Sequence, residues 1–538
     1  MSVVYRPGQE EAIQRIVGAY PDKKFVFLDA PCGSGKSLIL VHAAKVLWER
    51  NGMRAVYTTP QVPLVNQLET DSLLMLKVIM GRRNYPCSYL TTETADTAPC
   101  VVGLSKGSEV ISPQMIYKEC QEEKKLHCEY YAKLRETRTA PIWGTTLEFF
   151  LLTGRKDEKV LIVDEADGIT SYLVGRNSLH MGEKFWKDDS WQDIWIQFLH
   201  PLSFSQRDIT EYNADEILSV LGELYQRFQG CVSVADEMTE NAGTQKDLAK
   251  AAHWRDYLVR VSDRIKFLMT IPQDVVLFWN DEGAFCASPV TLQNSFRELC
   301  EPFDFVVLSS GSFGDIRFMA SELGIESYEH VKTGFSFPAD RCPVVNLATK
   351  GLSHKNLESE IGNVVSELEQ IMAKEPGRGF IHVPSYYLMD MVCSVMSSEP
   401  LRRIVLCDKT NRNTSFKKWV GNGIPNSVFI APGMYEGIDL KDDLAEWQVV
   451  IKAPYPDLKD VKVRKRLSMP DGEQWYRQET LRKLLQCLGR IMRSEDDQGR
   501  TYILDKHVSD LLYASDIDWV RARMRKGEIL KWKQRKQP

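Results

Sequence analysis

A glycine-rich segment with the chemistry of a phosphate-binding loop occupies residues 30–37, Ala-Pro-Cys-Gly-Ser-Gly-Lys-Ser. It follows the apolar run KFVFLD (24–29) and precedes an apolar stretch, 38–48, that suits a helix. Gly33 and Gly35 let the backbone turn tightly enough to aim several N–H groups at phosphate oxygens. The positive N-terminal end of the new helix adds to that attraction.

Side chains of this loop would hold both the phosphates and a metal ion. We expect Lys36 to reach the β- and γ-phosphates and the Ser37 hydroxyl to ligate Mg²⁺, with Ser34 contributing to the cradle. The pattern normally begins with glycine, and Ala30 stands there instead. A chance match is the alternative, although strand, loop and helix follow in the expected order.

An acidic pair after another apolar run would supply the second half of a triphosphatase site. KVLIV (159–163) leads directly into Asp164 and Glu165, and Asp167 follows. We expect Asp164 to hold Mg²⁺ and Glu165 to accept a proton from the attacking water. A plain exposed acidic turn is the alternative. In company with the phosphate loop, the pair predicts ATP hydrolysis.

Positive charge from across a cleft would complete such a site. In QCLGRIMR (486–493), a helix would place Gln486, Arg490 and Arg493 at i, i+4 and i+7, on one face. Arginines there can neutralise the γ-phosphoryl charge in the transition state, which couples hydrolysis to closure of two lobes. An ordinary charged helix is the alternative.

The elements that position these residues show the alternation of strand and helix that builds parallel sheets. Short apolar runs fall into two groups: 24–29, 54–59, 159–165 and 305–310, then 379–383, 403–406, 427–431, 448–453 and 501–505. Continuous Val/Ile/Leu runs suit strands that are buried on both faces. The predicted fold class is α/β with two parallel-sheet lobes, divided near 333–346.

Two long stretches interrupt the first lobe. Residues ~80–140 show little strand pattern and contain a cluster of cysteines. Residues ~172–285 carry apolar residues at helical spacing, and Asn213 is a candidate cap for the first helix. Insertions of this size are usually functional attachments rather than loops.

Composition points to an intracellular globular protein of several domains. The chain has 538 residues, 43% of them apolar, and a formal charge of −5, so it lacks an overall basic field for nucleic acid. No apolar stretch approaches the ~18 residues of a membrane helix, and no apolar signal core opens the sequence. The tail 521–538 is strongly basic, and it is either a phosphate-binding arm or a solvated, frayed helix.

These motifs occur in the order found in superfamily 2 helicases, and most of the chain resembles their XPD/DinG-type iron–sulphur branch. The matches in the first lobe are Gln9, Ala30–Ser37, Thr58–Pro60, Asp164–Asp167 and Ser309–Ser312. Those in the second are 377–389, Tyr435–Leu440, Pro454–Pro456 and 486–493. The resemblance implies RecA-like lobes and nucleotide contacts by Gln9 (on adenine), Gly33, Ser34, Gly35, Lys36, Ser37, Gly437 and Asp439.

The resemblance also gives the clustered cysteines a role, because the family inserts a [4Fe–4S] domain between its first and second motifs. The cysteines at that place are Cys87, Cys100, Cys120 and Cys128. Four thiolates are the ligand set of an iron–sulphur cube. Zinc also takes four cysteines, and unliganded thiols are a third interpretation. The spacings contain no C-x-x-C pair, unlike those of many members.

The resemblance implies a domain organisation and a function. The first lobe comprises 1–80, 141–171 and 286–335; the cluster domain is 81–140, the helical arch 172–285, and the second lobe with its basic tail 336–538. The implied enzyme is an ATP- and Mg²⁺-dependent 5′→3′ DNA helicase that acts on single-stranded and forked DNA, with the cluster domain where the strands part. We expect a monomer that does not bind membranes and is cytoplasmic in a prokaryotic or viral context, or nuclear in a eukaryote.

Asp167 departs from the branch, which usually has histidine at this position to give DEAH. DEAD is typical of RNA-dependent relatives, so an RNA helicase is one alternative. A translocase or protein remodeller that separates strands poorly is another. A nuclease-linked member and a scaffold with degenerate motifs are weaker alternatives, because no extra metal cluster is visible and the catalytic residue types are intact.

Overall fold

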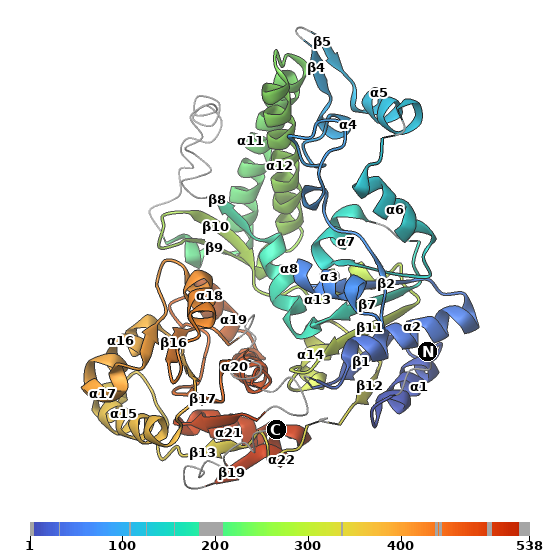
Figure 1. The fold of residues 1–538 in the computed structure, drawn as a ribbon. Coiled ribbons are helices and arrows are strands. Elements are labelled where there is room, and N and C mark those ends of the chain that lie inside the picture. The colour runs from blue at the N-terminus through green and yellow to red at the C-terminus, as the bar shows by residue number, and fades with distance from the viewer. Residues whose placement is uncertain are drawn as a thin grey trace.

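The computed structural model describes residues 5–31, 33–106, 109–124, 126–154, 157–181, 208–334, 337–435, 440, 444–491 and 498–526. Figure 1 shows two α/β lobes next to each other. A helical hairpin and an irregular segment with the clustered cysteines rise together from the first lobe. No helix among the described residues is long and apolar enough to cross a bilayer.

The first lobe is built on a parallel sheet with the strand order β12-β1-β11-β7-β2-β6-β3. The strands are β1 (Phe25–Asp29), β2 (Ala55–Thr59), β3 (Lys77–Val78), β6 (Ile142–Thr146), β7 (Val160–Asp164), β11 (Phe305–Ser310) and β12 (Tyr328–Lys332). Because β1, β11 and β7 are parallel neighbours, the segments that follow them meet at one edge of the sheet.

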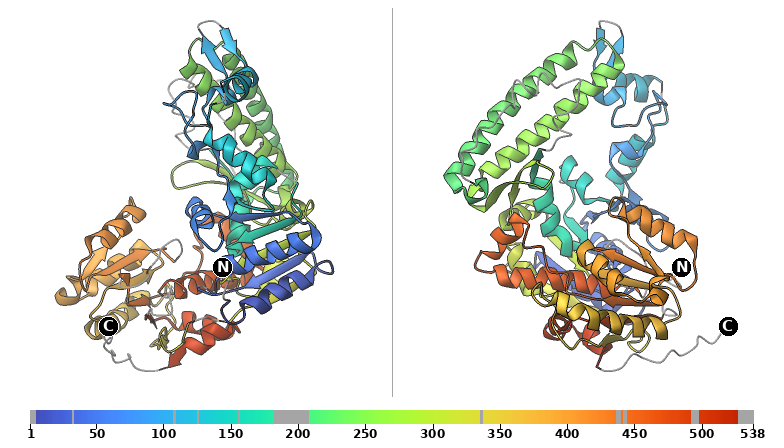
Figure 2. Two further views of the ribbon diagram at one scale, coloured as in Figure 1. Left: turned by 45° about the vertical axis from the view of Figure 1, so that its right-hand side comes forward. Right: turned by 90° about the vertical axis from the view of Figure 1, so that its left-hand side faces the viewer.

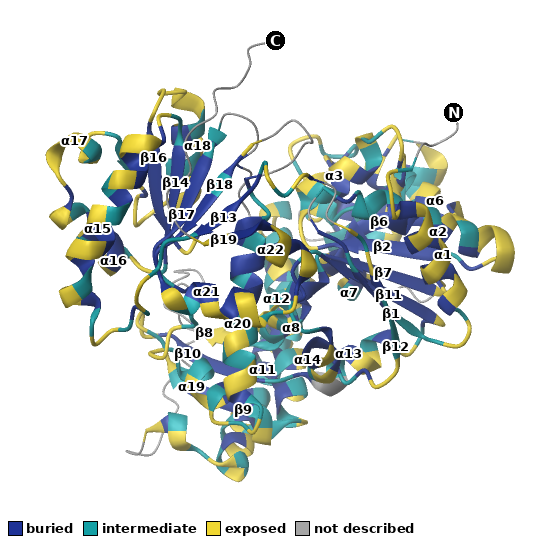
Figure 3. Ribbon diagram, turned by 90° about the horizontal axis from the view of Figure 1, so that it is seen from below, coloured by how far each residue is buried: buried dark blue, intermediate teal, exposed yellow. Residues whose placement is uncertain are grey.

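Helices cover this sheet, and in Figure 3 their outer faces are exposed while the strands are buried. They are α1 (Gln9–Ala19), α2 (Lys36–Asn51), α3 (Val62–Thr70), α7 (Leu147–Thr153), α8 (Ile169–Asn177), α13 (Gln293–Cys300) and α14 (Ile316–Glu322). Apolar side chains on the two sides of β1 belong to two separate apolar cores, so each face of the sheet is covered by a core.

The second lobe repeats this architecture with the parallel order β15-β16-β14-β17-β18-β13-β19. Its strands are β13 (Val344–Asn346), β14 (Gly379–Val383), β15 (Ile404–Leu406), β16 (Val428–Pro432), β17 (Trp447–Val450), β18 (Arg500–Ile503) and β19 (Met524–Lys526). Its helices are α15 (Leu357–Lys374), α16 (Tyr386–Val395), α17 (Ser398–Leu401), α18 (Arg412–Asn422), α19 (Val461–Leu467), α20 (Gly472–Leu488), α21 (Lys506–Ala514) and α22 (Asp518–Arg523).

Every strand expected from an apolar run is present, and the predicted fold class of two parallel-sheet lobes is confirmed. The two lobes contain the additional strands β3, β6, β12, β13 and β19, which lie at the edges of the sheets or next to them. Their sequences are accordingly mixed, as in YEHVK of β12, and they carry no continuous apolar run.

The helical insertion is an antiparallel hairpin of α11 (Ala214–Glu240) and α12 (Gln245–Met269). Asn213 caps α11 in a full capping box with Glu216, which confirms the expected cap. The hairpin stands on a small antiparallel sheet of β8 (Leu179–Met181), β10 (Phe285–Pro289) and β9 (Val275–Trp279), with its own apolar core.

The cysteine-bearing segment has few regular elements: α4 (Pro99–Val102), β4 (Leu104–Lys106), β5 (Glu109–Ile111), α5 (Pro113–Lys118) and α6 (Glu129–Thr139). Helix α12 contacts α4 and β4, and Gln245 Nε2 donates to the carbonyl oxygen of Gly103 at 3.0 Å. The hairpin and the cysteine segment therefore meet far from the sheet, as both views in Figure 2 show.

Candidate nucleotide site and motor core

The phosphate loop joins β1 to α2, as expected, and two glycines set its shape. Gly33 and Gly35 both have positive φ, 81° and 77°. A Cβ at Gly33 would lie 2.1 Å from the Phe337 ring, and one at Gly35 would lie 2.4 Å from Gln9 Nε2. The close approach and the left-handed backbone together explain why these positions hold glycine.

Lys36 is the first residue of α2 and forms an ion pair with Glu165 at 3.1 Å. The predicted cradle lysine and the predicted proton acceptor are thus neighbours across the sheet edge. Glu165 itself has a left-handed backbone with φ 52°, a strained conformation that is common at functional sites. A nucleotide γ-phosphate bound by Lys36 would lie beside this carboxylate.

Asp164 is buried at the end of β7 and accepts a hydrogen bond from the Tyr57 hydroxyl at 2.7 Å and from the Glu165 backbone N–H at 3.0 Å. Burial raises the pKa of Asp164, and Lys36 opposes that rise. The Tyr57 hydroxyl therefore holds one of the two residues expected to bind magnesium, Asp164.

Gln9 lies behind the phosphate loop. Its Oε1 accepts the Arg6 backbone N–H and its Nε2 donates to the Ser34 carbonyl oxygen, both at 2.8 Å, and only 3% of the residue is exposed. In this conformation Gln9 supports the predicted phosphate loop. Its contact with adenine stays a prediction.

Asp167 is the centre of a hydrogen-bond network between the lobes. Its carboxylate accepts hydrogen bonds from the hydroxyls of Ser310 (2.6 Å), the last residue of β11, and of Ser312 (2.9 Å), two residues further on. From the second lobe, Gln486 Nε2 donates to it at 2.7 Å and the Arg482 guanidinium lies 3.7 Å away. The acidic motif, the serine motif and α20 are thus in direct contact across the cleft.

The expected helical face of Gln486, Arg490 and Arg493 is wrong in one respect. Helix α20 ends at Leu488, and Gly489 occupies its C-cap. Arg490 therefore lies beyond the helix, half-buried, and its Nε has no hydrogen-bond partner among the described residues. Gly489 keeps right-handed helical dihedrals (φ −82°, ψ −5°), and the low helix propensity of glycine favours the end of the helix here. Arg493 lies outside the described residues.

The fifth family motif is only partly described. Tyr435 is buried and stacks on His382 with ring centroids 5.4 Å apart. Gly437 and Asp439, the residues expected to contact nucleotide, lie outside the described residues.

The four clustered cysteines come together. Cys87, Cys100, Cys120 and Cys128 line one pocket, together with Arg82 and Tyr131. The sequence separates these cysteines widely, so their convergence depends on the fold of the whole segment. Cys120 lies in a π-helical turn, Glu119–Glu123, a feature frequent at functional sites.

The charge around these thiols is mixed. Burial raises the pKa of Cys100 and of Cys120, whereas the Arg82 guanidinium opposes the rise at Cys100. No three His, Cys, Asp or Glu side chains among the described residues form a group that could hold a metal ion. Four thiols that line one pocket are the donor set of an iron–sulphur cube, and zinc also takes four thiolates. Binding of a cluster by these cysteines therefore stays a prediction.

Two contributors to the site were not predicted. Arg482 lies one helical turn before Gln486, so a search for charged residues on that face of the helix would have found it. Tyr57 gave no such signal, because its contact with Asp164 exists only where β2 pairs with β7.

Family models match both lobes. The DEAD/DEAH box helicase model matches residues 6–99 and the helicase C-terminal domain model matches residues 368–522. Among curated proteins, the "Regulator of telomere elongation helicase 1 homolog" of Drosophila persimilis is 21% identical over 256 residues, and that of Drosophila melanogaster 23% over 254. Each match covers 41% of this chain, and the chain spans about a quarter of each relative.

Solved structures share the whole fold. An XPD helicase superposes with a TM-score of 0.64 at 15% identity, covering 98% of this chain and all of the other. Xpd4 of S. tokodaii gives a TM-score of 0.59 at 14% identity, covering 97% of this chain and all of the other. The likeness extends to both lobes and both insertions.

Proposed function

Because this chain is an XPD/DinG-type member of the superfamily 2 helicases, we propose that it is an ATP-dependent DNA helicase that moves 5′→3′ on single-stranded DNA and unwinds duplex. The observation that carries the proposal is the network at Asp167. A single buried carboxylate connects the acidic and serine motifs of one lobe to Gln486 of the other. Through such a link, a change at the nucleotide site would change the position of the second lobe.

The chemistry proposed for the site is in-line attack of water on the γ-phosphate. Lys36 binds the β- and γ-phosphates, and the backbone of Gly33–Ser37 holds their oxygens. Glu165 accepts the proton of the attacking water. Ser37 and Asp164 are the residues that would hold Mg²⁺, which supplies positive charge to the phosphates. Arg490, with Arg493, would bring charge from the second lobe.

Coupling follows from how the lobes are connected. When nucleotide draws Arg490 toward the phosphates, Gln486 and Asp167 keep the two lobes in register. Hydrolysis removes the charge that held Arg490, so the lobes separate. Alternate closing and opening would ratchet a strand that crosses both lobes.

The two insertions would form the DNA-separating part. Their contact at Gln245 and Gly103 closes a path from the first lobe through the hairpin to the cysteine segment. Cys87, Cys100, Cys120 and Cys128 would bind a [4Fe–4S] cluster, which would hold this otherwise irregular segment rigid where the duplex parts. The cluster role rests on the convergence of the four thiols.

An RNA helicase is the second candidate, favoured by the aspartate at position 167. Stimulation of ATP hydrolysis by single-stranded RNA and by DNA of equal sequence and length discriminates the two. Greater stimulation by RNA would support the second candidate and exclude the first.

The proposed function is tested by strand displacement on forked duplexes with either a 5′ or a 3′ single-stranded tail. We expect ATP-dependent unwinding of the 5′-tailed fork alone, and an anaerobic preparation should be brown and contain four irons per chain, the content of one cube. ATP hydrolysis without displacement on either fork would instead identify a translocase. Unwinding of the 3′-tailed fork would contradict the proposed direction.

A further inference from the structure

The carboxyl end of helix α20 is held by two buried side chains from other elements of the second lobe. The last four carbonyl oxygens of a helix have no partner within it. Gln448 Nε2, on β17, donates to the carbonyl oxygen of Cys487 at 3.2 Å. Arg523 Nη1, on α22, donates to that of Leu488, also at 3.2 Å. Because both side chains are fully buried, the last turn before Arg490 is fixed from within the core.

Arg523 also joins this helix end to the start of the second lobe. Its Nε donates to the carbonyl oxygen of Cys342 at 2.6 Å, two residues before β13, and its guanidinium lies 5.4 Å from the centroid of the Trp519 ring. Arginine keeps its charge in a protein interior, and the negative end of a helix dipole attracts a cation. This member of the basic stretch 521–538 thus lies inside the second lobe and not on a solvated surface.

The residue that follows Arg490 is held as well. Ile491 is buried and forms a small apolar cluster with Phe337 and Cys342. The Phe337 ring in turn packs over Gly33 of the phosphate loop. The backbone is therefore fixed on both sides of Arg490, and the contacts that follow it extend to the phosphate loop.

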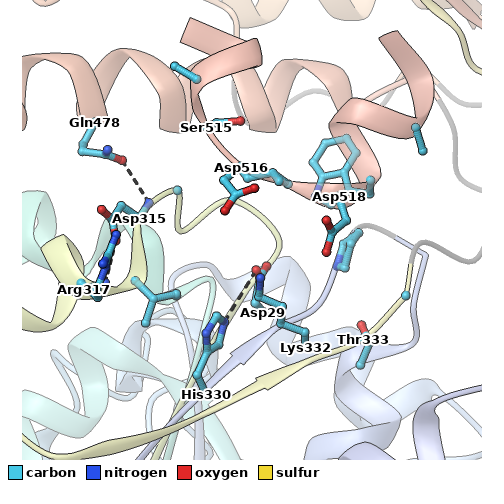
Figure 4. Close-up of a pocket in the computed structure, with 18 of the residues that line it drawn as sticks. Asp29, Asp315, Arg317, His330, Lys332, Thr333, Gln478, Ser515, Asp516 and Asp518 are labelled. Carbon is cyan, nitrogen blue, oxygen red and sulfur yellow. Dashed lines mark hydrogen bonds and ion pairs between the residues drawn. The ribbon is translucent and has the colours of Figure 1, made fainter.

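Helix α22 borders the boundary between the lobes. A cavity of about 710 Å³ lies there, lined by Asp29 of β1 and by Asp518, Trp519 and Ala522 of α22, among others. Figure 4 shows Asp518 across this cavity from Asp29. One side of α22 thus faces the first lobe, whereas Arg523 does not line the cavity and contacts the second. The side chain that holds the end of α20 therefore lies next to the boundary that closes when Arg490 approaches the phosphates.

We propose that Arg523 is a positioning residue for ATP hydrolysis, which fixes the end of α20 so that Arg490 meets the transferred phosphoryl group. The inference rests on the proposed function, because it assumes that Arg490 brings charge to the phosphates. A displacement of about 1 Å at a reacting site can lower a rate by ~10²-fold. Because Arg490 would neutralise charge that develops in the transition state, its misplacement lowers kcat and leaves the KM for ATP nearly unchanged.

The test measures kcat and KM for ATP at saturating single-stranded DNA. Arg523→Gln leaves a shorter side chain with a single donor nitrogen. We expect its kcat to fall roughly ten- to a hundredfold and its KM to stay within about twofold of the wild type. Arg523→Lys keeps the charge and should retain more turnover. Arg521→Gln, exposed on the same helix, is the matched control and should resemble the wild type.

A second change shows whether Arg523 acts through Arg490. In an Arg490→Gln background, adding Arg523→Gln should lower kcat by less than about twofold, because the group that it positions is already lost. Thermal unfolding gives the folded fraction of each variant, and turnover is expressed per folded molecule. A side chain needed only for stability would lower the folded fraction and leave that turnover unchanged.

The outcomes separate the inference from the proposed function. Wild-type turnover in folded Arg490→Gln contradicts the role of Arg490 in the proposed function and overturns the inference with it. Loss of turnover in Arg490→Gln, together with an unchanged kcat in folded Arg523→Gln, overturns the inference alone. So do equal losses from Arg523→Gln in the two backgrounds, or a raised KM with a normal kcat. If Arg523→Gln does not fold, the same measurements on Arg523→Lys decide.

Discussion

Lys36 and Glu165 are the pair on which the proposed chemistry depends at the scale of single residues. Their ion pair places a cation and a base at one edge of the sheet, beside the buried Asp164. Without bound nucleotide, the positive charge of Lys36 and the negative charge of Glu165 neutralise each other. A γ-phosphate would compete with Glu165 for Lys36 and leave the carboxylate available to water.

Lys36→Ala should reduce ATP turnover by a factor of about a hundred or more, because a charged donor to the transferred phosphoryl group is lost. The fold should survive, since Lys36 is the first residue of α2 and belongs to neither apolar core of the first lobe. Steady-state phosphate release and thermal unfolding measure the two effects. Lys45→Ala, an exposed lysine on the same helix, is the control. Wild-type turnover in Lys36→Ala would contradict the assignment of residues 30–37 as a phosphate-binding loop.

Asp167 and Gln486 should act as one unit. Either Asp167→Asn or Gln486→Ala is expected to lower DNA-stimulated ATP turnover by roughly tenfold, as for a hydrogen bond to a charged group. The double variant should be little worse than either single one, because the same contact is removed. Gln474→Ala, an exposed residue on the same helix, is the control. Additive losses would show that the two residues work independently.

At the scale of elements, the cysteine segment depends on more than its own secondary structure. Its helices and strands are short, and its aromatic residues are packed around Arg82, which lies 4.5 Å from the Tyr130 ring centroid and 5.4 Å from that of Tyr131. A segment with so little regular structure gains stability when a metal cluster joins distant thiols.

Cys100→Ser and Cys128→Ser test this element. Each should abolish iron binding and strand displacement while leaving DNA-stimulated ATP hydrolysis within about threefold, because the motor lobes have their own cores. Iron content, visible absorbance and the two activities are measured together. Cys393→Ser, in the second lobe, should resemble wild type. Normal unwinding by a variant that contains no iron would show that strand separation does not require the cluster.

At the scale of the whole molecule, the lobes also meet away from the nucleotide. Arg466 of α19 pairs with Glu322 of α14 at 3.2 Å, and its guanidinium forms two hydrogen bonds with Asp471 at 2.5 and 2.7 Å. Nearby, Gln478 accepts the Asp315 backbone N–H at 3.1 Å. These contacts join α14, which follows the serine motif, to the helices that carry Gln486.

Burial of Glu322 between the lobes makes stability depend on pH. Burial raises its pKa to about 7 and outweighs the attraction of Arg466, while Glu479 and Asp471 add to the rise. The unfolded chain ionises near its ordinary value of 4.5, so the folded protein binds the extra proton between the two values. Stability from this group is therefore present below about pH 4.5 and lost as the pH rises through 7.

Glu322→Gln should remove this dependence. Relative to the variant, the wild type should lose roughly 3 kcal/mol of stability between about pH 4.5 and pH 7.5. Thermal unfolding at the two pH values measures the difference. Glu326→Gln, an exposed glutamate just beyond α14, is the control. An identical pH profile for wild type and Glu322→Gln would exclude a raised pKa.

The amino-acid sequence was sufficient to predict the elements that depend on interactions between residues close together in the chain. The phosphate loop, the strand before Asp164 and the cap at Asn213 follow from apolar runs, glycine spacing and side-chain type, because the forces that form them act within a few residues. The order of motifs was enough to predict the two lobes. Edge strands such as β12 were missed because their half-exposed sequences lack the apolar signature.

The contacts between these elements became evident only from the folded molecule. The end of α20 at Gly489 moved Arg490 off the predicted face, and the bond from Tyr57 to Asp164 needed β2 beside β7. The cavity between Asp29 and Asp518 joins residues from opposite ends of the chain. The number of residues between two positions in the sequence does not give their distance in space. Side chains from separate elements meet only when both sheets have formed and the lobes have packed together.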